Sequence, residues 1–229
     1  MEDLRVDLAD MRRAVKIAGP FVAKKDVPSL RAVRVREAGG RVLVEATDRY
    51  VAVVVRLPEH QGKVPQGFDV SLPWGALRRA TAVVTRGAVV DGSDRTTTLV
   101  VAAPSEGVAT LRVDPGPSAG TVEEAVRCPV PVQGLEAIVT KAMAAPPGVC
   151  QGFPVRASRA LRALEALTRA RPGLTSVRVY PRAEGPQAFE VVGLRWPGFE
   201  VVGAIQLPAP PEHLGAPSAL FDALAEMTA

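Results

Sequence analysis

Residues 31–57 contain two runs in which apolar and polar side chains alternate, followed by an apolar run at 50–57, and this pattern favours a sheet. Val33 and Val35 alternate with two arginines, which is the period of a strand with one buried face. Gly39-Gly40 interrupts this alternation, and a Gly pair between two alternating runs favours a tight hairpin turn because Gly takes positive φ at little cost. Thr47-Asp48 marks a second break. We therefore expect a meander of three short strands, at residues 33–37, 42–46 and 50–57.

The apolar face of this meander needs a cover, and the segment before it predicts one. Residues 7–18 place their apolar side chains on one side of a helical wheel and Arg12, Arg13 and Lys16 on the other. Asp7 is a suitable N-cap, and Gly19-Pro20 ends the helix. We therefore expect a structural unit that consists of a strand, this helix and the three strands of the meander, with a basic outer face on the helix.

The same order of elements recurs with a period of about 60 residues. A strand at 68–72 precedes a helix at 74–84, which carries Arg78 and Arg79 on its polar side. Glycine-containing turns then separate three further strands, at residues 88–90, 96–102 and 108–113. We interpret residues 1–115 as one domain that contains two such half-units.

The rest of the chain repeats this plan incompletely after a Pro/Gly linker at 115–121. A strand at 126–132 and a helix at 133–143, which carries Lys141, are followed by only a short connection. A short strand at 153–156 and a helix at 158–169 come next, with Ser158 as N-cap and Arg159, Arg162 and Arg169 on its polar side. Strands are expected at 176–182, 188–194 and 199–207. We expect a shortened second domain at 121–208, then a Pro-rich linker and C-terminal helix at 209–229.

Charge and composition narrow the class of partner. The 229 residues carry a formal net charge of +4, and the body is basic while the last 21 residues carry only acidic groups. A basic body favours a polyanion such as nucleic acid, although arginines scattered over the surface for solubility give a similar balance.

No apolar run approaches the roughly 20 residues that span a bilayer, so we expect a cytoplasmic protein. Cys128 and Cys150 are too isolated for a disulfide framework, and each is expected to be a buried thiol.

Residue patterns typical of catalysis are missing from the sequence. His60 and His213 have no carboxylate at the spacing of a metal ligand or a triad. Asp48 is expected to bond backbone N–H groups in a turn, and Asp91 and Asp94 are expected to be solvated. No glycine-rich phosphate loop follows a strand. We expect a protein that is not an enzyme and that uses no metal or cofactor.

Three segments together resemble the bacterial DNA polymerase sliding clamp, the β subunit of DNA polymerase III. They read LADMRRAVKIAGPFV, VPSLRAVRVREAGGRVLVEATDRYVAVVV and FDVSLPWGALRRATAVV. The second is the most specific, because Val27-Pro28, Gly39-Gly40 and Ala46-Thr47-Asp48 occupy the places that the family gives to a Leu-Pro-like segment, a Gly-containing turn and an Ala-Thr-Asp triplet. The resemblance covers residues 1–115 and implies an α+β, DNA-clamp-like fold of repeated half-units, with helices on one side of antiparallel sheets.

In such a fold the outer faces of the helices line one surface. We expect a positive band there that neutralises phosphates without reading bases. Any one of these cations also fits an ordinary solvated helix face. The band consists of Arg12, Arg13, Lys16, Arg78, Arg79, Lys141, Arg159, Arg162 and Arg169.

The resemblance implies duplex DNA and replication or repair proteins as partners. Clamp rings are built from six complete domains through sheet-edge pairing, so one and a half domains per chain do not make that ring as a dimer. We expect a homo-oligomeric sliding-clamp-like protein that encircles or rides on DNA. The alternative is a clamp-fold regulator that binds a clamp, clamp loader or polymerase without forming a ring, and a third possibility is an unrelated two-domain α+β protein.

The C-terminal segment 218–227 is amphipathic and has two readings. Its apolar residues are either a docking peptide for a partner or a helix that packs on its own chain. These residues are Leu220, Phe221 and Leu224.

Overall fold

The structure is a computed structural model, and it describes residues 2–25, 27–58, 64–82, 97–102, 104–114, 121–148, 155–168, 176–182, 185–192, 194 and 196–206. Its helices are α1 (Leu8–Ala18), α2 (Trp74–Ala82), α3 (Leu135–Ala144) and α4 (Val155–Thr168), with short 3-10 turns η1 (Gly19–Phe21) and η2 (Pro28–Arg31). Its strands are β1 (Leu4–Asp7), β2 (Ala32–Ala38), β3 (Arg41–Thr47), β4 (Val51–Arg56), β5 (Asp69–Pro73), β6 (Thr98–Val101), β7 (Val108–Asp114), β8 (Val122–Arg127), β9 (Ser176–Tyr180), β10 (Gln187–Val192) and β11 (Glu200–Ile205).

The predicted meander is confirmed as β2, β3 and β4. Gly39 and Gly40 form the first turn with φ of 59° and 76°, which is the conformation that favours Gly. Val35 lies opposite Val44, which in turn lies opposite Val55 on the next strand. This register keeps one row of valines on the same face of the sheet.

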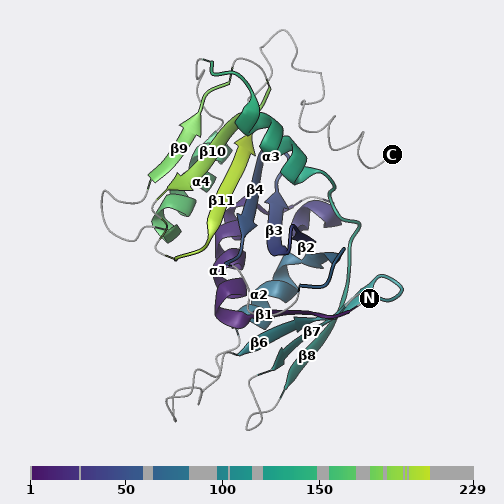
Figure 1. Cartoon of the computed structure of the whole chain (residues 1–229). Helices are drawn as coiled ribbons and strands as arrows, with labels where there is room; N and C mark the ends of the chain where they lie inside the picture. The colour runs from purple at the N-terminus through teal and green to yellow at the C-terminus, as the bar shows by residue number, and fades with distance from the viewer. Residues whose placement is uncertain are drawn as a thin grey trace.

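The strands form two antiparallel sheets (Figure 1). The longer sheet has the order β5-β2-β3-β4-β11-β10-β9, and the four-stranded sheet, at the lower end of the view, has the order β1-β6-β7-β8. The two N-terminal half-units exchange their first strands, because β1 pairs with β6 and β5 pairs with β2. This exchange ties both half-units into one body.

Helices α1, α2 and α4 share one hydrophobic core with both sheets. The core takes the valines of one face of the meander together with the apolar stripe of α1, and both α2 and α4 contact α1. Asp7 caps α1 as expected, since its Oδ1 accepts a hydrogen bond of 2.9 Å from the backbone N–H of Asp10. The amphipathic helices therefore orient as their patterns predict.

Helix α3 lies on the opposite face of the longer sheet. Leu43, Ala52 and Val54 point away from α1 and pack against Leu135 and Val139 of α3 in a second, smaller core. Alternate residues of a strand face opposite sides of a sheet, so the two cores share strands β3 and β4 but not side chains. The expectation that this helix lies on the same side as the others is wrong.

Strands β4 and β11 join the N-terminal and C-terminal parts of the longer sheet. Gly203 on β11 lies opposite Val53, and a Cβ on Gly203 would lie 2.2 Å from Cζ of Phe189 and 2.3 Å from the carbonyl oxygen of Ala52. Phe189 stacks on Phe21 with 5.9 Å between ring centroids. Only glycine fits at this crossing without displacing its neighbours.

Predicted boundaries differ from the structure most clearly at β8 and at the start of α4. The strand expected at 126–132 is β8 at Val122–Arg127, because Pro129 and Pro131 lack the N–H that a ladder needs. The backbone of α4 is already helical at Val155, so Ser158 lies inside the helix and is not its N-cap. The strand expected at 88–90, residues 115–120 of the predicted domain linker and the C-terminal segment lie outside the described residues, and the division into domains stays a prediction.

Among the described residues, no helix has the length and apolar character that crossing a membrane requires.

Candidate nucleic-acid interface

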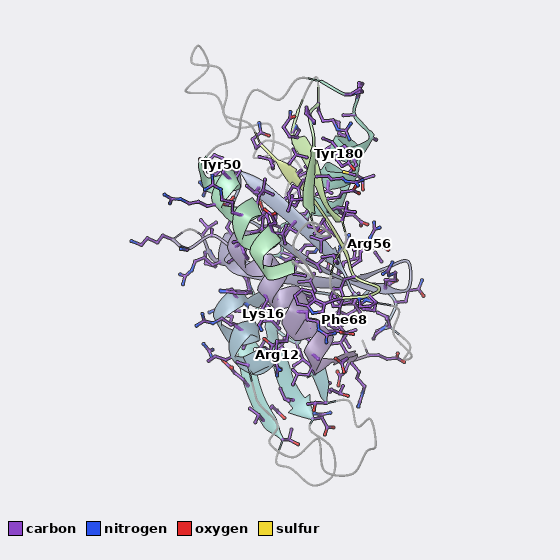
Figure 2. The ribbon with its side chains drawn as sticks, turned by 90° about the vertical axis from the view of Figure 1, so that its left-hand side faces the viewer. Arg12, Lys16, Tyr50, Arg56, Phe68 and Tyr180 are labelled. Carbon is purple, nitrogen blue, oxygen red and sulfur yellow. The ribbon has the colours of Figure 1, made fainter. Side chains whose placement is uncertain are left out.

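Three of the helices expose a basic stripe on the side away from the shared core. Lys16 of α1, Arg78 of α2, and Arg159 and Arg162 of α4 are exposed. Within the part of the chain that the structure describes, none of these four forms an ion pair. Because α1 contacts both α2 and α4, the structure brings cations from three helices onto one layer. Figure 2 shows Arg12 and Lys16 on this side of the longer sheet and Arg56 on the other.

Two predicted cations of α1 also hold neighbouring elements. The Nε of Arg12 donates a hydrogen bond to the backbone carbonyl of Thr81, which joins α1 to α2. Arg13 forms an ion pair of 2.6 Å with Asp10, and its guanidinium lies 6.0 Å from the ring centroid of Trp196. Both side chains are half-buried, so they contribute less free charge to the surface than Lys16.

The remaining predicted cations differ from Lys16, Arg78, Arg159 and Arg162 in their ion pairing or in the face of the sheet on which they lie. Arg79 is exposed on α2 but pairs with Glu124 of β8 at 2.5 Å. Lys141 is exposed on α3, which lies on the opposite face of the longer sheet, so the structure does not bring it together with the others. Arg169 lies outside the described residues, as do Leu220, Phe221 and Leu224.

The opposite face of the longer sheet carries a network of ion pairs. From the sequence pattern alone, this face is expected only to be basic. Arg34 pairs with Asp69, and its Nη2 also donates to Oε1 of Gln133 at 2.7 Å. Arg36 pairs with Glu45 at 2.9 Å, and the Glu45 side chain is fully buried. Burial raises the pKa of Glu45 above its ordinary value, and the charges of the two arginines oppose this effect without cancelling it. Arg34 and Arg36 are therefore engaged by carboxylates rather than available to a phosphate.

The same network continues across α3 to β11. Glu136 of α3 pairs with both Arg36 and Arg56, and Glu200 of β11 pairs with Arg56 at 3.0 Å and with Arg41 at 2.7 Å. Burial raises the pKa of Glu136, but hydrogen bonds and charges from the two arginines outweigh it and leave the pKa below its usual value. Hydrogen bonds from Arg41 and Arg56 lower the pKa of Glu200. The network fastens α3 to the sheet.

A further arginine holds the C-terminal end of α3. Arg182 donates hydrogen bonds to the backbone carbonyls of Met143 at 2.6 Å and Ala145 at 2.7 Å. A cation is favourable at a helix C-terminus, where carbonyls lack intrahelical partners. Helix α3 is therefore fixed to the sheet by salt bridges near its start and by Arg182 at its end.

A pocket of about 660 Å³ lies where the C-terminal end of α1, the start of α2 and the middle of α4 meet. We call it the junction pocket. Its charged residues are Lys24, Arg31, Arg159 and Asp48, and its apolar residues are Pro20, Val22, Ala23, Trp74 and Ala160, with Gly19 and Gly75 completing the lining. A Cβ on Gly19 would lie 2.7 Å from Cη2 of Trp74, so the indole rests directly on the glycine backbone.

Sequence reasoning did not find the junction pocket, because its residues come from five separate segments. Asp48 lines it as a turn residue whose Oδ1 accepts hydrogen bonds from the backbone N–H groups of Tyr50 and Val51 at 3.1 and 3.0 Å. This confirms the expected role of Asp48 in its turn. Among the described residues, no cluster of three His, Cys, Asp or Glu side chains has the arrangement of a metal site.

The fold is α+β and DNA-clamp-like, as the sequence predicts. The crystal structure of the DNA polymerase III β subunit from Thermotoga maritima superposes with a TM-score of 0.54 at 13% identity, covering 94% of this chain and 67% of that chain. A putative DNA polymerase III β subunit from Eubacterium rectale gives a TM-score of 0.57 at 8% identity, covering 89% of this chain and 64% of that one.

A third similar structure is a sliding clamp from Pseudomonas aeruginosa bound to griselimycin, with a TM-score of 0.54 at 10% identity over 94% of this chain and 68% of that chain. The chain thus spans about two thirds of the length of these clamps. At such identities the likeness shows the fold alone. No protein-family model matches the chain, and no curated protein matches it either.

Proposed function

We propose that this protein is a non-catalytic, sliding-clamp-like factor that rides on duplex DNA without sequence preference and tethers replication or repair proteins. The observation that carries the proposal is the layer formed by α1, α2 and α4, which presents four exposed cations free of ion pairs within the described part of the chain. Cations on long, flexible side chains neutralise phosphates without selecting bases.

The clamp-like fold supports this proposal. The solved structures that resemble the chain are sliding clamps of DNA polymerase III. In this chain the basic helix layer is separated by the longer sheet from the network around Glu45 and Glu136, where arginines are already neutralised. The four exposed cations of the helix layer have no such ion pairs within the described residues, so we place the DNA on the helix side.

The test is duplex affinity measured by fluorescence anisotropy with a labelled oligonucleotide of arbitrary sequence. The triple variant Lys16→Glu/Arg78→Glu/Arg162→Glu changes one exposed cation on each helix. We expect its affinity at about 50 mM salt to fall on the order of 10-fold or more, because each cation neutralises a phosphate.

The matched control is Lys141→Glu, an exposed cation on the opposite face of the sheet. Its affinity should stay within about two-fold of the unchanged chain, since α3 lies away from the proposed DNA surface. Equal losses in both proteins would show that net charge, and not the helix layer, determines binding. Both proteins should keep the circular dichroism spectrum of the parent chain.

A second candidate is a clamp-fold module that binds a clamp, clamp loader or polymerase without forming a ring. It is favoured by one feature of the fold: the next described element after β8 and α3 is α4, where the half-unit plan calls for three strands. A full chain that fails to bind duplex DNA even at low salt would support this second candidate.

A further inference from the structure

We propose that the acidic C-terminal segment, residues 207–229, docks in the junction pocket of its own chain. This proposal does not require that the protein bind DNA. It assigns an occupant to the pocket and chooses between the two readings of the amphipathic segment at 218–227.

The first argument is charge complementarity. Lys24, Arg31 and Arg159 are exposed around the pocket, and none of them forms an ion pair within the described part of the chain. Asp48, the acidic residue of the lining, is buried and accepts hydrogen bonds from backbone N–H groups. The C-terminal segment carries three carboxylates, at Glu212, Asp222 and Glu226, and neither lysine nor arginine. Opposite charges that meet over a partly apolar surface fix the orientation of a docked segment.

The second argument is apolar complementarity. The indole of Trp74, with Pro20, Val22 and Ala160, supplies the apolar lining of the pocket. In the segment, Leu220, Phe221 and Leu224 fall on one face of a helix, and Asp222 falls on the opposite, polar face. An amphipathic helix that lays such a face into a groove is a common mode of peptide recognition.

The third argument is reach. The backbone N–H of Gln206, the last described residue, donates a hydrogen bond of 2.7 Å to the carbonyl of Tyr50, which is two residues from Asp48 of the pocket lining. The connection from Gln206 to Ser218 spans up to about 40 Å when extended. At the millimolar effective concentration that a short linker gives, even an affinity of about 100 µM leaves the pocket roughly nine-tenths occupied.

The experiment uses the two tryptophans as reporters, because one lines the pocket and the other does not. The chain contains Trp74 and Trp196, and Trp196 packs against Phe199 outside the pocket lining. In 19F NMR of 5-fluorotryptophan-labelled protein, the Trp74 resonance should shift when residues 207–229 are deleted, while the Trp196 resonance stays in place. A synthetic peptide of residues 207–229, added to the shortened chain, should return the Trp74 resonance saturably to its position in the full chain.

Matched variants separate docking from general effects of charge. Phe221→Asp should reproduce the Trp74 shift of the deletion, whereas Thr228→Asp, which adds the same charge outside the 218–227 segment, should not. Arg159→Glu should weaken peptide binding to the shortened chain by at least about five-fold, a change of about 1 kcal/mol. Arg162→Glu on the same helix, outside the pocket lining, should change it by less than two-fold.

Three outcomes would overturn the proposal. An identical Trp74 resonance in the full and shortened chains would show that the segment does not occupy the pocket. Peptide binding that is insensitive to Arg159→Glu would place the segment elsewhere on the body. A Trp74 shift that depends on protein concentration, together with a doubled mass by light scattering, would show that the segment of a second copy fills the pocket instead. Failure of duplex binding in the anisotropy assay would leave each of these readouts unchanged.

Discussion

At the scale of single residues, two glycines allow close packing where any side chain would collide. Gly203 of β11 leaves room for the ring of Phe189, which lies opposite it on the paired strand β10, and Gly19 contacts the indole of Trp74 at the edge of the junction pocket. Neither glycine has the positive φ that makes a turn glycine recognisable from its neighbours. Their requirement for a missing Cβ comes from contacts with residues distant in the chain, so it is visible only in the folded protein.

We expect Gly203→Ala to lower the free energy of unfolding by about 2–3 kcal/mol, because the new methyl group overlaps both Phe189 and the backbone of Ala52. Urea unfolding followed by circular dichroism measures the change. Gly75→Ala is the matched control, since its nearest neighbour is the flexible end of Arg79 at 3.5 Å and alanine is the better helix former. The account of this crossing is wrong if both variants have the stability of the parent chain.

At the scale of elements, the sequence predicts helices and strands better than it predicts where they pack. The period of residues 8–18 and the hydrophobic pattern of residues 31–57 are local signals, and the helix and the three strands that they predict are confirmed. The position of α3 depends on Leu43 and Val54 forming a second apolar patch on the other side of the sheet. The sequence indicates this second apolar patch only if strands β3 and β4 are assumed to be covered on both faces. The arginines of β2 appear free until Glu45 and Glu136 are placed beside them.

The attachment of α3 predicts a dependence of stability on acid pH. Glu136 and Glu200 have pKa values below their ordinary value of about 4.5 in the folded chain, so the stability that they supply is present above that pH and is lost as the pH falls through the lowered values. Glu136→Gln should therefore make the free energy of unfolding less dependent on pH below about 4.5. We expect a difference of about 1 kcal/mol or less, because partly exposed ion pairs are screened.

Urea titrations between pH 3 and 6 measure this dependence, with Glu123→Gln on the exposed edge of β8 as control. Glu45 acts in the opposite direction, because a raised pKa makes its contribution greatest at low pH and reduces it as the pH rises. The charge of Glu136 is one of the causes that raise the pKa of Glu45, so Glu136→Gln also reduces this opposing contribution, and the measured change is the sum of the two effects. An unchanged pH profile in Glu136→Gln would mean that the salt bridges do not hold α3.

At the scale of the whole molecule, the fold combines one interlocked pair of half-units with a C-terminal part that extends the same sheet through β4 and β11. The edge strand β8 carries Glu123, Glu124 and Arg127 and is soon followed by Pro129, which are features that discourage pairing with another sheet. Formation of a homo-oligomer through sheet edges stays a prediction. The proposal that α1, α2 and α4 bind duplex DNA does not require an oligomer, because the three basic helices belong to one chain.

The measurement that tests this claim most directly is the salt dependence of duplex affinity, compared between the parent chain and Lys16→Glu/Arg78→Glu/Arg162→Glu. Each phosphate contact contributes about −0.9 to the slope of log affinity against log salt concentration, so the triple variant should have a slope shallower by about 2 to 3. That result would place all three helices against the phosphate backbone. Equal slopes for the two proteins, or no duplex binding by the parent chain at about 50 mM salt, would contradict the account.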